Sequence, residues 1–166
     1  MRCDLTSLPR VLIAGAGQIS PDTGGVRDRF MVDGAVTGGR FSLVEHLFPP
    51  RALAAPMHRH HDEDEFSYIT RGRIGAVLGD DEVFAGPGDL IVKPRGQWHT
   101  FWNAGDEPAA CLEIISPGGL EQAFREMAAL GPMLDAETLA ELAARYRCDI
   151  DMDATGPVIA RHNLAF

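Results

Sequence analysis

Three histidines and one glutamate between residues 58 and 103 have the types and spacing of a metal site. His58 and His60 are two residues apart, so on a β-strand both side chains point to the same face, roughly 6.6–7 Å apart along the strand. Glu65 follows an acidic bend, and His99 lies on a later segment that a closed β topology can bring alongside. Three nitrogen donors and one oxygen donor, with no thiolate, suit a divalent iron, manganese, nickel, copper or zinc ion.

Each of these residues has a simpler interpretation when it is taken singly. A lone histidine or glutamate is more often a surface charge or a satisfied hydrogen-bond partner than a metal ligand. His61 points to the opposite side of the strand from His60 and is expected to be solvated. It is therefore the spacing between the four residues that favours a site.

Residues 30–116, which carry this group, have the pattern of an antiparallel β protein. Short apolar segments alternate with turn clusters of Gly, Pro, Asp and Asn about every 8–12 residues, which indicates a sandwich or barrel, and about eight strands is typical of a jelly roll. The expected strands are residues 40–48, 55–60, 65–70, 74–78, 82–85, 90–93, 99–102 and 109–116.

The pattern changes to a helical one after residue 116. Apolar residues from Leu120 to Leu130 recur at helical spacing, and Gly131-Pro132 ends the run. A second helix is predicted to begin at Asp135, a good N-cap. The helical extension is expected to span residues 119–147 and to pack outside the β domain, and the weakly patterned residues 149–166 are expected to be a tail or a partner contact.

The first 30 residues are predicted to form an arm with one short strand at residues 11–14. Gly15-Ala16-Gly17 could begin a dinucleotide-binding loop, but Ser20 stands where the third glycine would be. The residues from Pro21 to Gly25 break the helix that such a fold requires. Nucleotide binding is therefore not expected.

Composition limits the class of protein. The 166 residues fit one domain, and 45% hydrophobic residues allow a packed core. A formal net charge of -9 argues against a nucleic-acid partner, and no apolar run approaches the roughly 18 residues of a membrane span. Cys3, Cys111 and Cys148 lie far apart and form no CxxC pair, which favours reduced thiols. We expect a cytoplasmic protein, because no segment resembles a signal peptide.

The segment from residue 52 to 103 resembles the two sequence motifs of the cupins. The first motif, G-x5-H-x-H-x(3,4)-E-x6-G, is matched except at its first glycine, which is Ala52 in this sequence. Only Glu65, and not Glu63, has the required six residues before Gly72. The second motif, G-x5-P-x-G-x2-H-x3-N, is complete and is formed by Gly88, Pro94, Gly96, His99 and Asn103. The surrounding residues are similar to small bacterial cupins described as quercetin 2,3-dioxygenase-like.

The resemblance implies an all-β fold, a double-stranded β-helix or jelly-roll cupin barrel over about residues 40–116. Two C-terminal helices would follow within one domain of residues 1–166. It also implies one divalent transition metal per chain, with iron favoured, on His58, His60, Glu65 and His99. The implied activity is that of a dioxygenase-type oxidoreductase in which Glu65 is a ligand or also the catalytic base. A redox-neutral isomerase or decarboxylase and a non-enzymatic ligand-binding cupin remain alternatives.

Strand parity predicts the wall of the substrate pocket. If Glu65 faces inward, so do Ser67 and Ile69, and if His99 faces inward, so does Phe101. Such a wall suits a small, largely apolar substrate with metal-chelating oxygens. Small cupins are usually dimers, so a homodimer is also expected, with the apolar residues 11–13 covering an exposed sheet edge.

Overall fold

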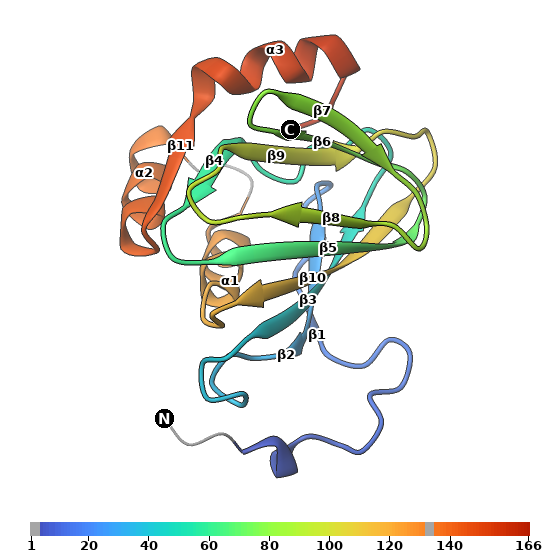
Figure 1. The fold of residues 1–166 in the computed structure, drawn as a ribbon, viewed down its shortest axis with the longest axis vertical. Coiled ribbons are helices and arrows are strands. Elements are labelled where there is room, and N and C mark those ends of the chain that lie inside the picture. The colour runs from blue at the N-terminus through green and yellow to red at the C-terminus, as the bar shows by residue number, and fades with distance from the viewer. Residues whose placement is uncertain (1–3, 132–134) are drawn as a thin grey trace.

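The strands form two antiparallel sheets that face each other, with helices packed outside them (Figure 1). The computed structural model describes residues 4–131 and 135–166, so Cys3 and Pro132 lie outside the described residues. The fold is mostly β, as expected. Hydrogen bonds between the described residues leave the sheets as two separate layers and do not join them into a closed barrel.

The larger sheet has six strands. In spatial order they are β1 (Gln18–Ile19), β2 (Arg27–Val32), β3 (Ser42–Phe48), β10 (Ala109–Ser116), β5 (Asp64–Arg71) and β8 (Leu90–Lys93). Every second residue of β3 is buried, which is the period of a strand with one face on the core. The inner face of this sheet therefore supplies one wall of the interior.

The smaller sheet has five strands and carries most of the predicted metal ligands. In spatial order they are β11 (Cys148–Asp151), β4 (Met57–His60), β9 (His99–Asn103), β6 (Ile74–Leu78) and β7 (Asp81–Ala85). All five residues of β9 are buried, because both faces of this strand are covered. The eight strands predicted between residues 40 and 116 are confirmed, each end within two residues of its expected place.

The predicted strand at residues 11–14 is wrong. These residues form no strand, and the side chains of Val11 and Ile13 are 71% and 72% exposed. The N-terminal strands are instead β1 and β2, and Phe30 and Val32 of β2 are buried. A run of four apolar residues is stable as a strand only when a neighbouring strand pairs with it and buries one face, and residues 11–14 have no such neighbour among the described residues.

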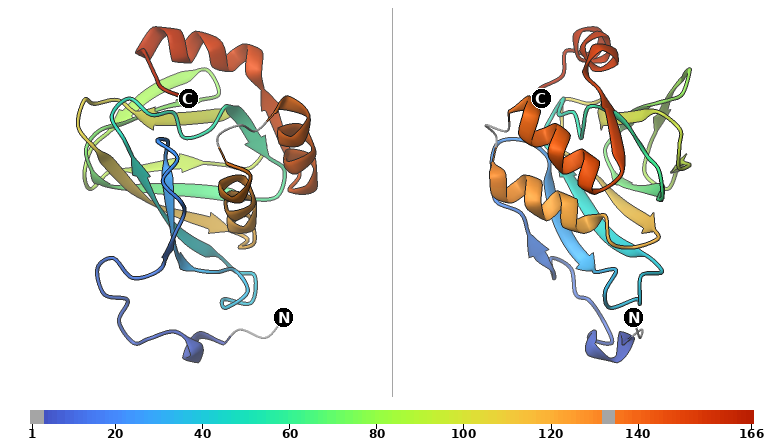
Figure 2. Two further views of the ribbon diagram at one scale, coloured as in Figure 1. Left: turned by 180° about the vertical axis from the view of Figure 1, so that it is seen from behind. Right: turned by 90° about the vertical axis from the view of Figure 1, so that its left-hand side faces the viewer.

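The two predicted helices are confirmed as α1 (Glu121–Leu130) and α2 (Ala136–Arg145), and Figure 2 shows them side by side at one end of the sheets. Asp135 caps α2, its Oδ1 accepting a hydrogen bond from Thr138 N at 2.7 Å. A short 3₁₀ helix, Leu5–Ser7, lies in the N-terminal arm.

The expected tail at residues 149–166 is instead β11 followed by a third helix, α3 (Met152–His162). Pro157 lies inside α3 and weakens its helical pattern. The helix is stabilised because Val158 packs with Leu53 and the fully buried Trp102 on the outer side of the smaller sheet. Thr155 Oγ1 also accepts a hydrogen bond from Met57 N at 2.8 Å, which ties α3 to β4.

Two remaining expectations concern thiols and membranes. Cys111 and Cys148 are free thiols. Within the described ranges, no helix is both long and apolar enough to cross a bilayer.

Candidate metal centre

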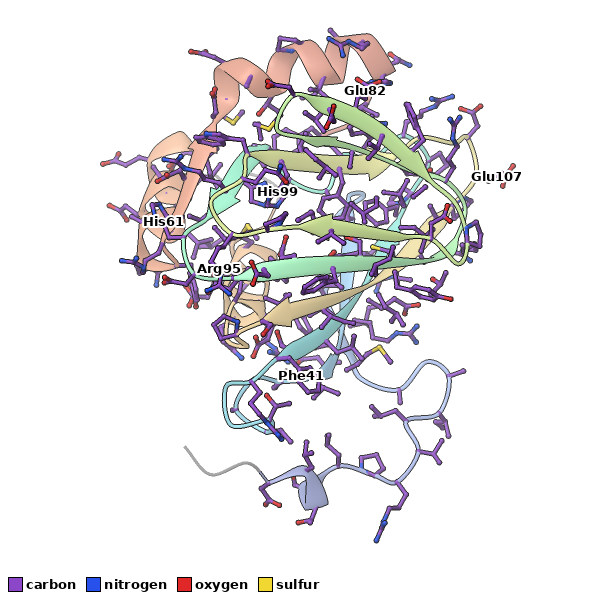
Figure 3. The ribbon with its side chains drawn as sticks, in the orientation of Figure 1. Phe41, His61, Glu82, Arg95, His99 and Glu107 are labelled. Carbon is purple, nitrogen blue, oxygen red and sulfur yellow. The ribbon has the colours of Figure 1, made fainter. Side chains whose placement is uncertain are left out.

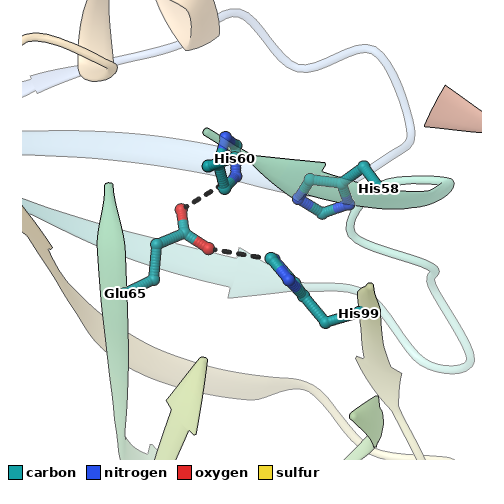
Figure 4. A group of neighbouring side chains, drawn as sticks. All are labelled: His58, His60, Glu65 and His99. Carbon is teal, nitrogen blue, oxygen red and sulfur yellow. Dashed lines mark ion pairs between the residues drawn. The ribbon is translucent and has the colours of Figure 1, made fainter. Parts of the chain in front are cut away.

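The four predicted ligands come together between the two sheets. His58 and His60 lie on β4, Glu65 lies on β5 and His99 lies on β9, directly opposite His58 in the strand register. All four side chains are buried, and one ligand atom from each lies within 4.8 Å of the others (Figure 4). The tertiary structure therefore assembles the donor set that the spacing predicted.

The turn before β9 holds the second motif against the first. Gln97 N donates to Pro94 O at 3.2 Å, and Gly96 N donates to His60 O at 2.7 Å. Gly96 has φ +76°, a conformation that residues with a Cβ rarely adopt. On its other edge β4 pairs with β11, Cys148 lying opposite His60. The strand that carries two ligands is thus fixed from both sides.

Hydrogen bonds on the far side of two imidazoles determine which nitrogens face the centre. His58 Nδ1 donates to Pro56 O at 2.7 Å, and His99 Nδ1 donates to Gln97 O at 3.0 Å. With the proton on Nδ1, each Nε2 has a free lone pair, as in metal-binding histidines.

The centre contains buried polar atoms that a cation would satisfy. Both ring nitrogens of His60 and the Nε2 of His99 have no hydrogen-bond partner among the described residues. His60 Nε2 lies 3.6 Å from Glu65 Oε1, and His99 Nε2 lies 3.2 Å from Glu65 Oε2, as the dashed lines in Figure 4 mark. Leaving a buried polar group unsatisfied costs about 1–3 kcal/mol. The donor set therefore fits a divalent metal ion.

The protonation states also suit a metal. Burial, with the neighbouring His99 and His60, holds the pKa of His58 well below its usual range, and burial lowers the pKa of His60. Burial alone would raise the pKa of Glu65, but Lys93 and the nearby histidines outweigh it and hold that pKa well below its usual range. Neutral imidazoles and an ionised carboxylate are the forms that bind metals.

Lys93 is a site residue that the sequence analysis missed. Its Nζ is fully buried and lies 3.1 Å from Glu65 Oε2 and 3.0 Å from Glu113 Oε2. Burial lowers the pKa of Lys93, but Glu113 and Glu65 outweigh this and raise it. Strand parity could have found the residue, because Ile91 and Lys93 are the two buried positions of β8.

A cavity of about 200 Å³ opens beside the centre. His58, Glu65 and Phe101 line it, together with residues of β2, β3, α1 and the loop before β2. Ser67 and Ile69 are fully buried, as strand parity predicted, but neither residue lines the cavity. Ser67 Oγ donates to Glu113 Oε2 at 2.6 Å, and Ile69 packs in the core between the sheets.

A second cavity of about 80 Å³ lies between α1, α2 and β4. Apolar side chains such as Leu120, Met127 and Leu142 form most of its wall, and His58 and His60 also reach it. The centre is therefore adjacent to one cavity with polar groups and to one that is mainly apolar.

Two polar residues near the centre have roles other than metal binding. His61 points away from the interior that holds His99 (Figure 3), and its Nε2 lies 3.0 Å from Asp149 Oδ2 at the surface. Asn103 caps a turn, its Oδ1 accepting a hydrogen bond from Gly105 N at 2.9 Å.

The sandwich and its buried His₃Glu group define a β protein with a candidate metal centre. The cupin domain family matches residues 44–115 of the chain. No curated protein sequence matches this chain. The matched segment runs from β3 to β10 and contains all four predicted ligands.

Several solved structures have a similar fold. KdgF from Halomonas sp. is 19% identical, with a TM-score of 0.58, and the match covers 69% of this chain and 99% of that chain. A predicted oxalate decarboxylase from Thermotoga maritima is 18% identical, with a TM-score of 0.59. The match covers 64% of this chain and 98% of that chain. A structure from Silicibacter pomeroyi, described as a sugar phosphate isomerase from a cupin superfamily, is 27% identical, with a TM-score of 0.50. The match covers 70% of this chain and 75% of that chain.

Proposed function

We propose that this protein is a metal-dependent cupin enzyme that binds a small, oxygen-containing substrate in the cavity beside His58 and Glu65. The observation that carries the proposal is the convergence of four buried donors, two of which, His58 and Glu65, also line a cavity. A structural metal site is closed, whereas a catalytic one keeps positions open. At about 200 Å³, the cavity is smaller than the roughly 300–1,000 Å³ of pockets for drug-sized ligands, which favours a small substrate.

His58, His60, Glu65 and His99 would hold the ion. A divalent metal would polarise substrate oxygens as a Lewis acid, and a redox-active one would also allow oxidation by O₂. The protein holds Glu65 ionised through Lys93, which favours a ligand role and weakens Glu65 as a proton acceptor. Phe101 and the helix residue Phe124 supply apolar walls of the cavity.

The first candidate reaction is a dioxygenase-type oxidation. It is supported by the donor set, which lacks thiolates and suits iron, manganese or nickel, and by the similarity of the motifs to dioxygenase-like cupins. The apolar cavity behind His58 and His60 is also suited to an apolar group or to a small apolar molecule such as O₂.

The second candidate is a redox-neutral isomerisation or decarboxylation. It is supported by the 27% identical neighbour, whose structure is described as a sugar phosphate isomerase. The polar side of the cavity, where Asp28 and His46 lie, also suits proton transfer to or from a substrate.

Measuring dissolved O₂ during turnover distinguishes the dioxygenase reaction from the redox-neutral one. Protein loaded with Fe(II), Mn(II) or Ni(II) would be screened with catechols, diketones, flavonols and small oxo and hydroxy acids while O₂ is followed. Consumption of O₂ in step with product supports the dioxygenase, and unchanged turnover without O₂ supports the redox-neutral reaction. Saturable binding without turnover would show a ligand-binding protein.

The variant Glu65→Gln tests the second role of this residue. If the variant retains the metal but turns over substrate about 10²-fold more slowly, Glu65 also acts as a base.

We also propose that the protein is a homodimer. The N-terminal arm extends away from the sheets in Figure 1 and carries the exposed side chains of Val11 and Ile13, and β1 lies at a sheet edge. An exposed edge and apolar residues on an extended arm suit pairing with a second copy. The cytoplasmic location also stays a prediction.

A further inference from the structure

A buried histidine–aspartate pair forms part of the cavity wall and is not part of the donor set. His46 on β3 lies opposite Asp28 on β2, so the strand register brings the two side chains together. Asp28 Oδ1 accepts a hydrogen bond from His46 Nδ1 at 2.7 Å, and the His46 side chain is only 7% exposed. Both residues line the cavity that His58 and Glu65 also line.

The other ring nitrogen of His46, Nε2, is the one that remains for a ligand. It has no hydrogen-bond partner among the described residues, and Glu113 Oε2 lies 3.9 Å away, beyond hydrogen-bond distance. Phe48, Phe101 and Phe124 surround the imidazole, with ring centroids at 6.3, 5.8 and 5.6 Å. These rings fix the imidazole plane, so its Nε2–H is an oriented donor.

Asp28 favours the charged form of this imidazole in spite of its burial. Burial alone lowers the pKa of His46, but the hydrogen bond and charge of Asp28, with the charge of Glu113, outweigh it and raise the pKa above its usual value. Lys93 acts in the opposite direction. These three charged groups belong to β2, β10 and β8, so the charge on His46 is set from several strands of one sheet.

Stability of the fold is a weak reason for burying such a pair. Replacing a buried ion pair by apolar residues of similar volume is often neutral or stabilising, and apolar rings already surround His46. The charges around the cavity suggest another role. Among the residues that line the cavity, Asp28 and Glu65 are acidic and a protonated His46 is cationic, so a divalent metal would leave one net positive charge.

We propose that His46, held by Asp28, is a second binding point for the substrate and that the cavity takes small monoanionic acids. One substrate oxygen lies at the metal centre, and an anionic oxygen accepts the Nε2–H of His46. This inference rests on the proposed function and specifies the charge of its substrate. The substrate would therefore carry an anionic group, in addition to the largely apolar character expected from the sequence.

The test compares a charged ligand with a neutral ligand of the same shape. Zn(II)-loaded protein, which has no redox chemistry, would be titrated calorimetrically with pyruvate and with pyruvamide. His46→Phe removes the donor and suits the aromatic surroundings, and Asp28→Asn keeps the shape of the pair but removes its negative charge. His162→Phe is the matched control, because His162 pairs with Glu82 at 3.2 Å and packs on Trp102, away from the cavity.

We expect the preference for pyruvate over pyruvamide to fall about tenfold in His46→Phe and in Asp28→Asn, and to stay unchanged in His162→Phe. Pyruvate should also shift the His46 ring resonances in NMR spectra of the wild type. An unchanged preference in a folded, Zn-loaded Asp28→Asn protein would overturn the inference, and so would binding of pyruvamide without pyruvate by the wild type. Failure of the wild type to hold zinc or to bind either probe would overturn the proposed function as well.

Discussion

At the scale of single residues, His99 is the donor that joins the two motifs in space. It lies opposite His58 on the neighbouring strand, and its Nδ1 is held by Gln97 O. We expect His99→Ala to lower the metal content from about one ion per chain to a small fraction of that, because one of four ligands is lost. Elemental analysis of the purified protein measures this.

His61→Ala is the matched control, since it removes an exposed histidine next to the centre without removing a donor. Equal metal content in His99→Ala and the wild type would contradict the ligand assignment.

Lys93 balances the negative charges of Glu65 and Glu113 in the interior, and its replacement tests this role. Lys93→Met leaves Glu65 and Glu113 buried without their shared cation. Removing one partner of a buried ion pair typically costs about 3–5 kcal/mol, so the free energy of unfolding should fall by that amount in metal-free protein. A divalent ion bound beside Glu65 supplies positive charge, so added Zn(II) should stabilise the variant more than it stabilises the wild type.

Denaturant unfolding with and without Zn(II) checks this expectation. Lys93→Arg serves as the comparison that retains a positive charge. If Lys93→Met were as stable as the wild type without metal, the proposed role of Lys93 would be wrong.

At the scale of elements, Glu121 fixes the start of α1 to the loop that follows β2. The side chain is buried, and its carboxylate accepts hydrogen bonds from Gly34 N at 2.9 Å and Gly119 N at 2.7 Å. Burial raises the pKa of Glu121, but these bonds outweigh it and lower the pKa below its usual value of 4.5. The ionised carboxylate therefore stabilises the fold above about pH 4.5, and this contribution is lost as the pH falls through the lower pKa of the folded state.

Glu121→Gln should cost about 1.5–3 kcal/mol at pH 7, because hydrogen bonds to a charged group are replaced by weaker ones. The difference from the wild type should shrink at a pH below the folded-state pKa of Glu121. Denaturant unfolding at pH 7 and at acid pH measures both effects. Glu137→Gln, in the exposed first turn of α2, is the control and should change stability little. A difference that does not depend on pH would contradict the role of the charge.

At the scale of the whole molecule, the proposed dimer depends on the N-terminal arm. Light scattering at micromolar concentration should give twice the 18.0 kDa mass of the chain. Deletion of residues 1–16 should lower the mass to that of a monomer, because the arm carries Val11 and Ile13 and ends before β1. The metal content should not change, since the centre lies between the sheets. A wild-type mass near 18.0 kDa would contradict the dimer.

The sequence by itself determined the donor set and the strands that carry it. The spacing of His58 and His60 reports which face of a strand each side chain occupies, because the period of two is a local property of extended backbone. The turn clusters between residues 40 and 116 likewise marked the ends of eight strands. Local patterns of this kind need no knowledge of the partner strand.

Only the tertiary structure decided which side chains meet. Lys93 contacts Glu65 because β8 pairs with β5, and His46 reaches Asp28 because β3 pairs with β2. The C-terminal segment becomes a strand and a helix because it covers β4 and Trp102. The stability of these contacts depends on burial and on the charge of a partner far away in the chain. No local pattern specifies that partner. Only the tertiary structure therefore shows that Asp28 and His46 lie together on the wall of the cavity.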